Sequence, residues 1–487
     1  MIAPTKSLIP LVAATALALS VAATLSLSAQ AGPDRSRPPE LGAAPSLSVP
    51  PIQKVTLANG IPVWIVENRE VPLAQVNLLV LAGSGDDPAD KFGVASLTAA
   101  MLDEGAGARS SLQIADEVDR LGATLAASSS FDASAVRLNV PVSRLEPGLA
   151  IMADIALRPT FPDADLERVR RERLTSLLQA RDDPESVAPL AFQRLVFGPT
   201  HRFGTSAIGS EASLARLSRT DLRDFHARWY QPANARFIVV GDVTASAVVA
   251  ALDRAFGGWA NTTPAVRTPV PPAPQVGATQ IYLVNHPEAA QSQIRIGRVG
   301  VARNAEDFFA LEVLNTVLGG SFTSRLNQNL REEHQYTYGA ASRFDMRLSP
   351  GPFVAAAGVQ TDKTAEALRE FMKELTNISA PIPADQLARA KNYLALGFPA
   401  DFEASRDLAV RLEELMIYGL PDQYFGQYVG NIQAVTADAV QRAARAQIQT
   451  GRLAIVIVGD QKTIEPSIRA LGIAPVRVMR IEEALGL

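Results

Sequence analysis

Cysteine is absent from this chain, and histidine is nearly so. Without thiols the chain can form no disulfide bond, offer no thiolate to a metal and carry no lipid on a cysteine. No two of its histidines lie within five positions of each other, so a helix cannot present two imidazoles from adjacent turns. A zinc site assembled from distant histidines and carboxylates stays open at this point. The four histidines are His201, His226, His286 and His334.

Basic charge is scarce as well. The 46 lysines and arginines are outnumbered by 50 aspartates and glutamates, which gives a formal net charge of -4. Nucleic-acid-binding domains carry a basic excess, so that class of function is set aside. Two enzyme motifs are also missing: there is no G-x-S-x-G, and "GAGARS" at 105–110 lacks the third glycine of a dinucleotide-binding loop.

The long hydrophobic run of the sequence lies at its N-terminus. A single basic residue, Lys6, precedes a stretch rich in Ala, Leu and Val that closes on the small residues Ala29 and Ala31. Residues 1–31 thus have the pattern of a secretory signal peptide, and the Pro-rich residues 32–50 are typical of a flexible leader. We therefore expect a periplasmic or secreted protein. An uncleaved membrane tether is the alternative, because the run is long for a signal peptide.

The sequence contains an internal duplication. "FIVVGD" recurs as "IVIVGD", and the two glycines, Gly241 and Gly459, are 218 residues apart (459 − 241). Three stretches match in the same order at nearly this offset, which predicts two copies of one domain. The length of 487 residues agrees, because it exceeds what one core usually serves. The matching stretches are 63–68 with 281–286, 92–102 with 308–318 and 237–242 with 455–460.

Composition and periodicity predict the fold class. Runs of β-branched and apolar residues at 71–83 and 134–142 are typical of strands. Helical periodicity with a polar face recurs at 110–123, 165–183 and 219–230. We therefore expect an α+β protein of two homologous domains, each a mostly antiparallel sheet with helices packed on one face. The expected domains are residues 51–262 and 278–487, joined by a Pro-rich linker at 263–277.

A short helix is expected within "FGVASLTAAMLDEG", residues 92–105. Its apolar positions recur at helical spacing, and the facing positions are small and carry no titratable group. The apolar residues are Val94, Leu97, Met101 and Leu102, and the facing residues are Ser96, Ala99 and Ala100.

The order of these elements resembles the pitrilysin/insulinase (inverzincin) metallopeptidase family. In the first copy the resemblance rests on "LANGIPVWIVENREVPLAQVNLLVLAGSGDDPADKFGVAS", "ERVRRERLTSLLQARDDPES" and "LSRTDLRDFHARWYQPANARFIVVGDV". In the second copy it rests on "LNTVLGGSFTSRLNQNLREEHQYTYGA". It covers nearly the whole mature chain and implies a two-domain bacterial member, similar to the subunits of mitochondrial processing peptidase.

The resemblance also implies that the zinc motif of this chain is degenerate. In the family this helix carries H-x-x-E-H, whose histidines bind zinc and whose glutamate is the general base, and a later glutamate is the third ligand. Ser96 and Ala100 stand at the histidine positions, Ala99 at the glutamate position and Glu172 at that of the third ligand. We therefore expect this chain to bind no cofactor, to hydrolyse no peptide alone, and to use Glu172 as a solvated or ion-paired residue.

Two further family residues are present in "NLREEHQYTYGAASRF". Active members place an arginine and, seven residues later, a tyrosine near the zinc, where they hold the substrate and stabilise the oxyanion. Arg331 and Tyr338 have this spacing, so the resemblance implies substrate binding by these two residues. The alternative is structural: Arg331 caps a helix end or pairs there with Glu332 or Glu333, and Tyr338 begins a buried strand. Tyr336 is close enough to be confused with Tyr338.

Gly319 and Gly320 resemble in position the glycine-rich loop with which a non-catalytic subunit of mitochondrial processing peptidase handles substrate. The loop is shorter here, which favours a simple turn between two helices.

We therefore expect a non-catalytic, substrate-binding subunit of a heterodimeric periplasmic zinc peptidase. A paralogous partner subunit would supply H-x-x-E-H and the zinc, and the substrate would be a peptide added to a sheet edge. Without such a partner a homodimer is conceivable. The main alternative is a silent structural protein similar to the core subunits of the respiratory cytochrome bc1 complex, and a peptide-binding trap is a third.

Overall fold

The computed structural model of the protein describes residues 50–260 and 265–487. The predicted signal peptide at 1–31 and leader at 32–50 lie outside the described residues, apart from Pro50, as does the start of the predicted linker. The described residues belong to one compact unit, Ala44–Leu487. Among them there is no helix whose length and hydropathy would suit a membrane span.

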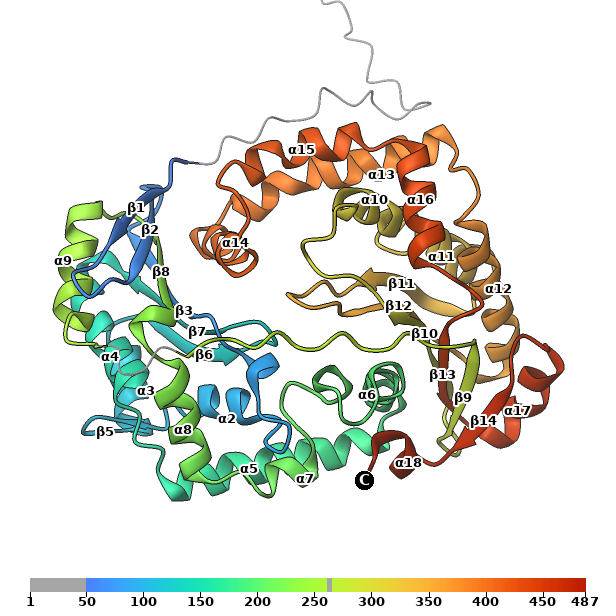
Figure 1. The fold of residues 1–487 in the computed structure, drawn as a ribbon, viewed down its shortest axis with the longest axis horizontal. Coiled ribbons are helices and arrows are strands. Elements are labelled where there is room, and N and C mark those ends of the chain that lie inside the picture. Colours follow the sequence, from blue (N-terminus) through green and yellow to red (C-terminus); the bar gives the residue numbers. More distant parts are fainter. Residues whose placement is uncertain (1–49, 261–264) are drawn as a thin grey trace, which may run out of the picture. The chain divides into compact units, whose positions relative to one another are not determined.

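The first half of the chain forms a six-stranded sheet (Figure 1). Within this sheet β2 and β8 run parallel, and all other neighbouring strands are antiparallel. The central strands are rich in Val, Ile and Leu, which suit a pleated surface that is buried. In spatial order the strands are β1 (Gln53–Thr56), β2 (Pro62–Glu67), β8 (Ala235–Gly241), β3 (Leu73–Val80), β7 (Ser134–Pro141) and β6 (Thr124–Ser129).

The second half forms a sheet with the same plan. Strands β9 and β13 run parallel, as β2 and β8 do in the first sheet. The sixth strand differs, because β14 is parallel to β9 whereas β1 is antiparallel to β2. Five strands therefore correspond between the sheets, and the predicted α+β class with two homologous halves is confirmed. In spatial order the strands are β11 (Thr337–Phe344), β12 (Pro352–Gln360), β10 (Gln291–Val299), β13 (Ala454–Gly459), β9 (Gln280–Asn285) and β14 (Val476–Met479).

Helices account for most of the remaining described chain. A small hairpin of β4 (Gly105–Ala106) and β5 (Arg109–Ser110) joins two of them. Those of the first half are α2 (Val94–Ala100), α3 (Ser111–Arg120), α4 (Leu145–Leu157), α5 (Asp163–Gln179), α6 (Pro184–Phe197), α7 (Glu211–Leu214), α8 (Arg219–Trp229) and α9 (Ala245–Phe256). Those of the second half are α10 (Phe308–Leu318), α11 (Arg325–Asn327), α12 (Thr364–Asn377), α13 (Ala384–Gly397), α14 (Ser405–Tyr418), α15 (Tyr424–Ala434), α16 (Ala437–Gln447), α17 (Gln461–Ala470) and α18 (Ile481–Leu485).

Each half packs helices of its own on one face of its sheet. In the first half, side chains of α2, α4, α8 and α9 share one core with one face of the sheet, where Val76, Leu78 and Leu138 are fully buried. In the second half, α10, α12 and α16 pack in the same way on side chains such as Ile294 and Phe353. This is the arrangement that the sequence predicts for each domain.

The opposite face of each sheet is covered by a helix from the other half. Helix α6 of the first half contacts β10 and β13, and helix α14 of the second half contacts β3 and β8 (Figure 1). Helices α6 and α14 begin 221 residues apart (405 − 184), so they are the same element of the two copies. This exchange explains why β3 is buried on both faces although it belongs to a mostly antiparallel sheet.

The linker also ties the two halves together. Residues 265–279 form neither helix nor strand, and β9 begins at Gln280. Arg267 Nη2 lies 2.8 Å from Asp86 Oδ2 in the first half. A few residues later, the Ser349 hydroxyl of the second half donates a hydrogen bond to the Val270 carbonyl. The Pro-rich segment is thus fastened on both sides.

Candidate functional site

Helix α2 is shorter than the predicted stretch of 92–105, and its start is firmly held. Asp87 accepts hydrogen bonds from the backbone N–H groups of Gly93, at 2.7 Å, and Ala95, at 3.0 Å. Its Oδ2 also lies 2.9 Å from Arg202 Nη2, in an ion pair that is almost fully buried. Burial raises the pKa of Asp87 to about 6, although Arg202 and the two N–H groups favour the carboxylate.

Gly93 adds a second constraint at the same point. Its φ of +99° lies in the left-handed region, and a Cβ there would collide with the Ile208 carbonyl. The helix ends at Ala100. The N–H of Met101 donates to the carbonyl of Thr98, three residues earlier, which is the hydrogen bond of a turn. The frame of this helix is therefore well determined, whatever its middle carries.

The middle of α2 carries no group that could ligate a metal. Ala99 is fully buried, whereas Ser96 and Ala100 are half-buried. Thr98 points its hydroxyl into the protein, where the Oγ1 atom has no hydrogen-bond partner. The structure therefore places the predicted motif positions on one short helix, and none of them offers an imidazole or a carboxylate.

Glu172 does not face this helix as a ligand would. It lies on α5 with its side chain 60% exposed, and its Oε1 is 3.0 Å from Arg168 Nη1 one turn earlier. Arg168 also pairs with Glu104. The carboxylate of Glu172 thus belongs to an exposed ion-pair network.

The residue of α5 that does reach α2 is Arg173. Its Nη2 donates to the Ser96 carbonyl at 2.9 Å, and its Nη1 is buried without a hydrogen-bond partner. Burial lowers the pKa of Arg173, but a guanidinium stays charged in proteins. A fixed positive charge beside Ser96 repels a divalent cation, so the residues at this place do not fit a zinc ion. Sequence reasoning missed Arg173, since its neighbour Glu172 matched the motif.

No other metal site is built into the described chain. Among residues 50–260 and 265–487 there is no group of three or more His, Asp and Glu side chains arranged to hold an ion. The four histidines have other partners or neighbours. His226, for example, bonds through Nε2 to the Ala156 carbonyl and stacks on Tyr230.

Arg331 and Tyr338 lie on one segment of the second half, in which Arg331 is half-buried with its Nε 3.5 Å from Glu332 Oε1. Arg331 belongs to a π-helical turn, Gln328–Glu333, and its guanidinium packs 4.5 Å above the ring of Phe322. Tyr338 is the second residue of β11 and is 90% exposed. Pairing of β11 with β12 is irregular between Thr337 and Ala340, which sets this part of the strand off from the sheet.

Tyr336 has a different environment. Its ring stacks on His334, with centroids 5.0 Å apart, and packs against the core of the second half. Of the two tyrosines, Tyr338 is therefore the one that is accessible to a ligand.

Gly319 and Gly320 form the predicted turn after α10. A Cβ on Gly319 would collide with Ser342 of β11, so glycine lets the turn lie against this strand. The turn leads directly to Phe322, whose side chain is 59% exposed. Phe322 and Arg331 are in contact, and Tyr338 follows at the start of β11; we call these three residues the Arg331 surface.

Each six-stranded sheet has two edge strands, β1 and β6 in the first and β11 and β14 in the second, and two of these four bear on the site. Strand β6 pairs only with β7, and β11 pairs only with β12. Strand β6 also packs against α2. Unpaired edges of this kind can accept an added strand from a peptide or another chain.

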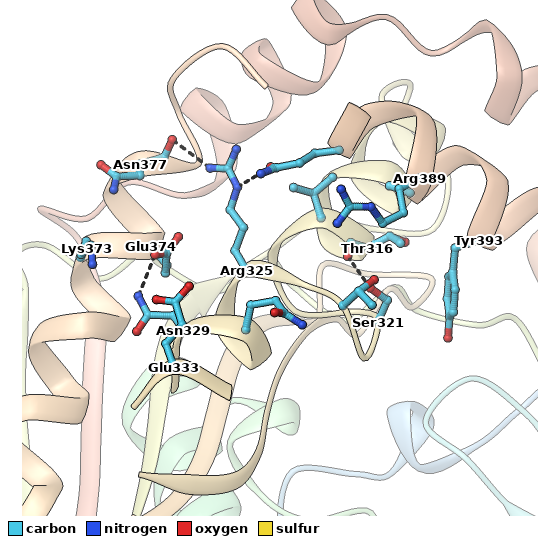
Figure 2. A pocket seen from close by; sticks show the side chains of 15 residues that line it. Thr316, Ser321, Arg325, Asn329, Glu333, Lys373, Glu374, Asn377, Arg389 and Tyr393 are labelled. Atoms are coloured by element: carbon cyan, nitrogen blue, oxygen red, sulfur yellow. Dashed lines mark hydrogen bonds between the residues drawn. The ribbon is translucent and has the colours of Figure 1, made fainter. Parts of the chain in front are cut away.

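Two pockets lie around α10 and α13, the counterparts of α2 and α5. A polar pocket of about 290 Å³ is lined by residues such as Thr316, Arg325 and Tyr393 (Figure 2). Several of its polar groups already have partners: Arg325 Nε donates to Gln386 at 2.9 Å, and Glu374 accepts from Asn329 at 2.8 Å. The second pocket, of about 540 Å³, is richer in aromatic rings and shares Tyr393 with the first.

Comparison with known proteins identifies the family. The family model described as "Insulinase (Peptidase family M16)" matches residues 63–196, and "Peptidase M16 inactive domain" matches residues 216–394. An uncharacterized zinc protease of Mycobacterium leprae is 26% identical over 428 residues, which are 86% of this chain and 94% of that protein. One from Mycobacterium tuberculosis is 27% identical over 438 residues, 88% of this chain and 98% of its own.

Solved structures agree in fold. The peptidase M16 inactive domain from Pseudomonas fluorescens has a TM-score of 0.78 at 25% identity, and the match covers 84% of this chain and 98% of that one. A protease from Helicobacter pylori has a TM-score of 0.79 at 21% identity, covering 84% of this chain and 100% of the other. The periplasmic protease PqqL from Escherichia coli has a TM-score of 0.71 at 18% identity, covering 86% of this chain and 49% of PqqL. With its two matching domains and blank zinc helix, the chain belongs to the insulinase (M16) peptidase family as a member that lacks the catalytic motif.

Proposed function

We propose that this protein is the non-catalytic, substrate-binding subunit of a heterodimeric zinc peptidase. A paralogous partner supplies H-x-x-E-H and its zinc, and this chain supplies Arg331 and Tyr338. The observation that carries the proposal is a contrast within the chain: the helix at the motif positions has no metal ligand and is contacted by Arg173, whereas Tyr338 is 90% exposed and follows Arg331 by seven residues. Both remaining residues are hydrogen-bond donors suited to a carbonyl oxygen that gains negative charge.

The substrate is an extended peptide. The free edges of β6 and β11 offer backbone hydrogen bonds to an added strand, which gives affinity with little dependence on sequence. Strand β6 contacts the blank helix α2, and β11 carries Tyr338. A peptide paired with either edge would run past one of the two places where the family keeps its catalytic and substrate-binding residues.

The cellular location is part of this proposal. The N-terminal residues 1–31 have the pattern of a signal peptide, which agrees with a periplasmic or secreted enzyme. A periplasmic protease is among the proteins with a similar fold. Immunoblotting of periplasmic and membrane fractions with N-terminal sequencing of the mature chain tests this location. A chain that begins after Ala31 in the periplasmic fraction supports it, and an intact N-terminus in the membrane fraction contradicts it.

The experiment that tests the function is hydrolysis of a quenched fluorescent peptide with added zinc. The chain alone is compared with the chain mixed with each H-x-x-E-H paralogue from the same genome. We expect activity only in a mixture, reduced at least about tenfold by Arg331→Ala or Tyr338→Phe. Arg369→Ala, at an exposed arginine of α12, and Tyr336→Phe, at the half-buried neighbouring tyrosine, are the matched controls and should leave the rate unchanged.

The other outcomes are equally informative. Chelator-sensitive activity of this chain alone would contradict the degenerate zinc site. An active mixture that both variants leave unchanged would remove the role of the Arg331 surface. No activity in any mixture would favour the structural alternative, in which the chain serves an assembly and catalyses nothing.

A further inference from the structure

The aromatic pocket of the second half contains a carboxylate, Glu312 of α10, and has a volume of about 540 Å³. Among the described residues no hydrogen bond or close ion pair engages this carboxylate. Burial raises the pKa of Glu312, although Arg303 and Arg411 lie near enough to favour its charged form. Most charged groups around it are satisfied by one another, because Arg303 bonds to Glu414 at 2.7 Å, and Arg411 bonds to both Glu414 and Asp401. With two arginines and three carboxylates among its lining residues, the pocket has a formal charge of −1.

Seven of the fifteen residues that line the pocket are aromatic, and the Arg303 guanidinium lies over two of these rings, 3.8 Å from the centroid of Phe308 and 5.2 Å from that of Tyr424. The lining includes rings from α10, α13, β11 and α15, and some of them stack closely, as Phe398 and Tyr428 do with centroids 3.9 Å apart. Aromatic faces carry negative charge density and attract a cation that sheds its water easily. The rings are Phe308, Phe344, Tyr393, Phe398, Tyr424, Phe425 and Tyr428.

The pocket occupies the second copy's counterpart of the zinc site. The duplication aligns Glu312 with Ser96, at an offset of 216, and Tyr393 with Glu172, at the offset of 221 that relates α6 to α14. In the first half this space is approached by the guanidinium of Arg173. In the second half the corresponding space is open, lined by rings and negatively charged.

We propose that this pocket binds an organic ammonium group, with Glu312 as its counterion and the aromatic rings as its walls. Charge complementarity favours a cation, because the lining carries one more carboxylate than arginine and Glu312 has no hydrogen bond or close ion pair among the described residues. The volume admits an alkylammonium the size of choline or of a lysine side chain, and it lies in the range of ordinary ligand sites. Arg331 and Tyr338 are not among the lining residues, so this inference stands or falls independently of the proposed function.

Calorimetric titration of the purified full-length chain tests the proposal with three probes. Choline carries the cation, and 3,3-dimethyl-1-butanol is its neutral isostere, in which carbon replaces the charged nitrogen. A short lysine-containing peptide and its acetyl-lysine form distinguish a side chain from a free small molecule. We expect choline or the lysine peptide to bind at least about tenfold more tightly than its neutral counterpart.

Variants assign the binding to the pocket. Glu312→Gln keeps the shape and removes the charge, and it should weaken cation binding about tenfold or more. The exposed Glu403→Gln makes the same change in net charge outside the pocket and should leave binding unaltered. Tyr393→Leu, which removes one ring of the wall, should also weaken binding and gives a second readout if Glu312→Gln unfolds. Equal binding of charged and neutral probes, no binding of any probe, or full affinity in both pocket variants would overturn the proposal.

Discussion

Helices α6 and α14 each cover the sheet of the other half, but at the same position one does so through an apolar side chain and the other through a polar one. Phe192 is the ninth residue of α6, and Glu413 is the ninth residue of α14. Phe192 points at β10, where Gly297 leaves space for its ring, since a Cβ there would come within 2.9 Å of it. Glu413 instead receives hydrogen bonds from Arg137 at 2.6 Å and from Asn77 at 2.7 Å on the first sheet.

The two halves therefore share the placement of this helix but differ in the chemistry of its contact. One contact between the halves is apolar and tolerates no unfilled volume. The other is a buried polar network that holds only while every member has its partner. A reversal of charge is seen before α2 and before α10, because Asp87 pairs with Arg202, whereas Arg303, at the corresponding position, pairs with Glu414.

The largest effect is expected at the apolar contact. Phe192→Ala should destabilise the protein by about 4 kcal/mol, since it removes a buried ring and leaves a cavity between α6 and β10. Urea unfolding followed by circular dichroism measures this change. Phe322→Ala, at an exposed phenylalanine, is the control and should stay within about 0.5 kcal/mol. Equal effects of the two substitutions would show that α6 does not cover the second sheet in solution.

Substitution at the polar contact should cost nearly as much stability, but a second substitution should restore most of it. Arg137→Ala leaves the carboxylate of Glu413, 5% exposed, without its cation, and should cost about 3 kcal/mol. The double variant Arg137→Leu with Glu413→Leu removes both charges and should recover most of the loss. Arg120→Ala breaks an ion pair in which both side chains are exposed and should change little. If the double variant loses as much stability as the two single substitutions add up to, the stabilising effects of Arg137 and Glu413 are independent of each other.

The smallest effect is a pH response from Asp87, in the first half. The pKa of Asp87 is raised from 3.8 to about 6 on folding, so the folded chain holds a proton there that the unfolded chain has released. Its contribution to stability is therefore largest below about pH 4 and is lost as the pH rises through about 6, with a slope of at most about 1.4 kcal/mol per pH unit.

Asp87→Asn removes this titration. Free energies of unfolding between pH 4 and 7 should then rise more steeply with pH, or fall less, than in the unchanged protein. Asp90→Asn, three residues later in the same loop and exposed, serves as the control and should leave the slope as it was. Identical slopes for Asp87→Asn and the unchanged protein would mean that Asp87 is ionised over the whole range.

Local patterns predict most elements well. The strand pattern at 71–83 contains β3, and the helical periods at 110–123 and 219–230 contain α3 and α8 within a few residues. The stretch at 92–105 overestimates α2, because the apolar Met101 and Leu102 are buried in a turn after the helix has ended. Periodicity records which side chains are buried, and it does not record where the hydrogen-bonded helix stops.

The candidate site was less predictable. The spacing of Arg331 and Tyr338 could be found by resemblance, but only the fold shows that Tyr338 is exposed while Tyr336 packs inward. Arg173 and Glu312 gave no signal, because an arginine or glutamate on an amphipathic helix is usually solvated. Their significance depends on the helix opposite, which one sequence does not specify.

By itself the sequence determined the two-copy design and the loss of the zinc motif, since both follow from residue identity and order alone. The tertiary structure decided the exchange of α6 and α14, the guanidinium against Ser96 and the place of the Glu312 carboxylate in an aromatic pocket. The physical reason is that each of these depends on groups far apart in the chain. Their burial and charge balance exist only once the helices and sheets have packed.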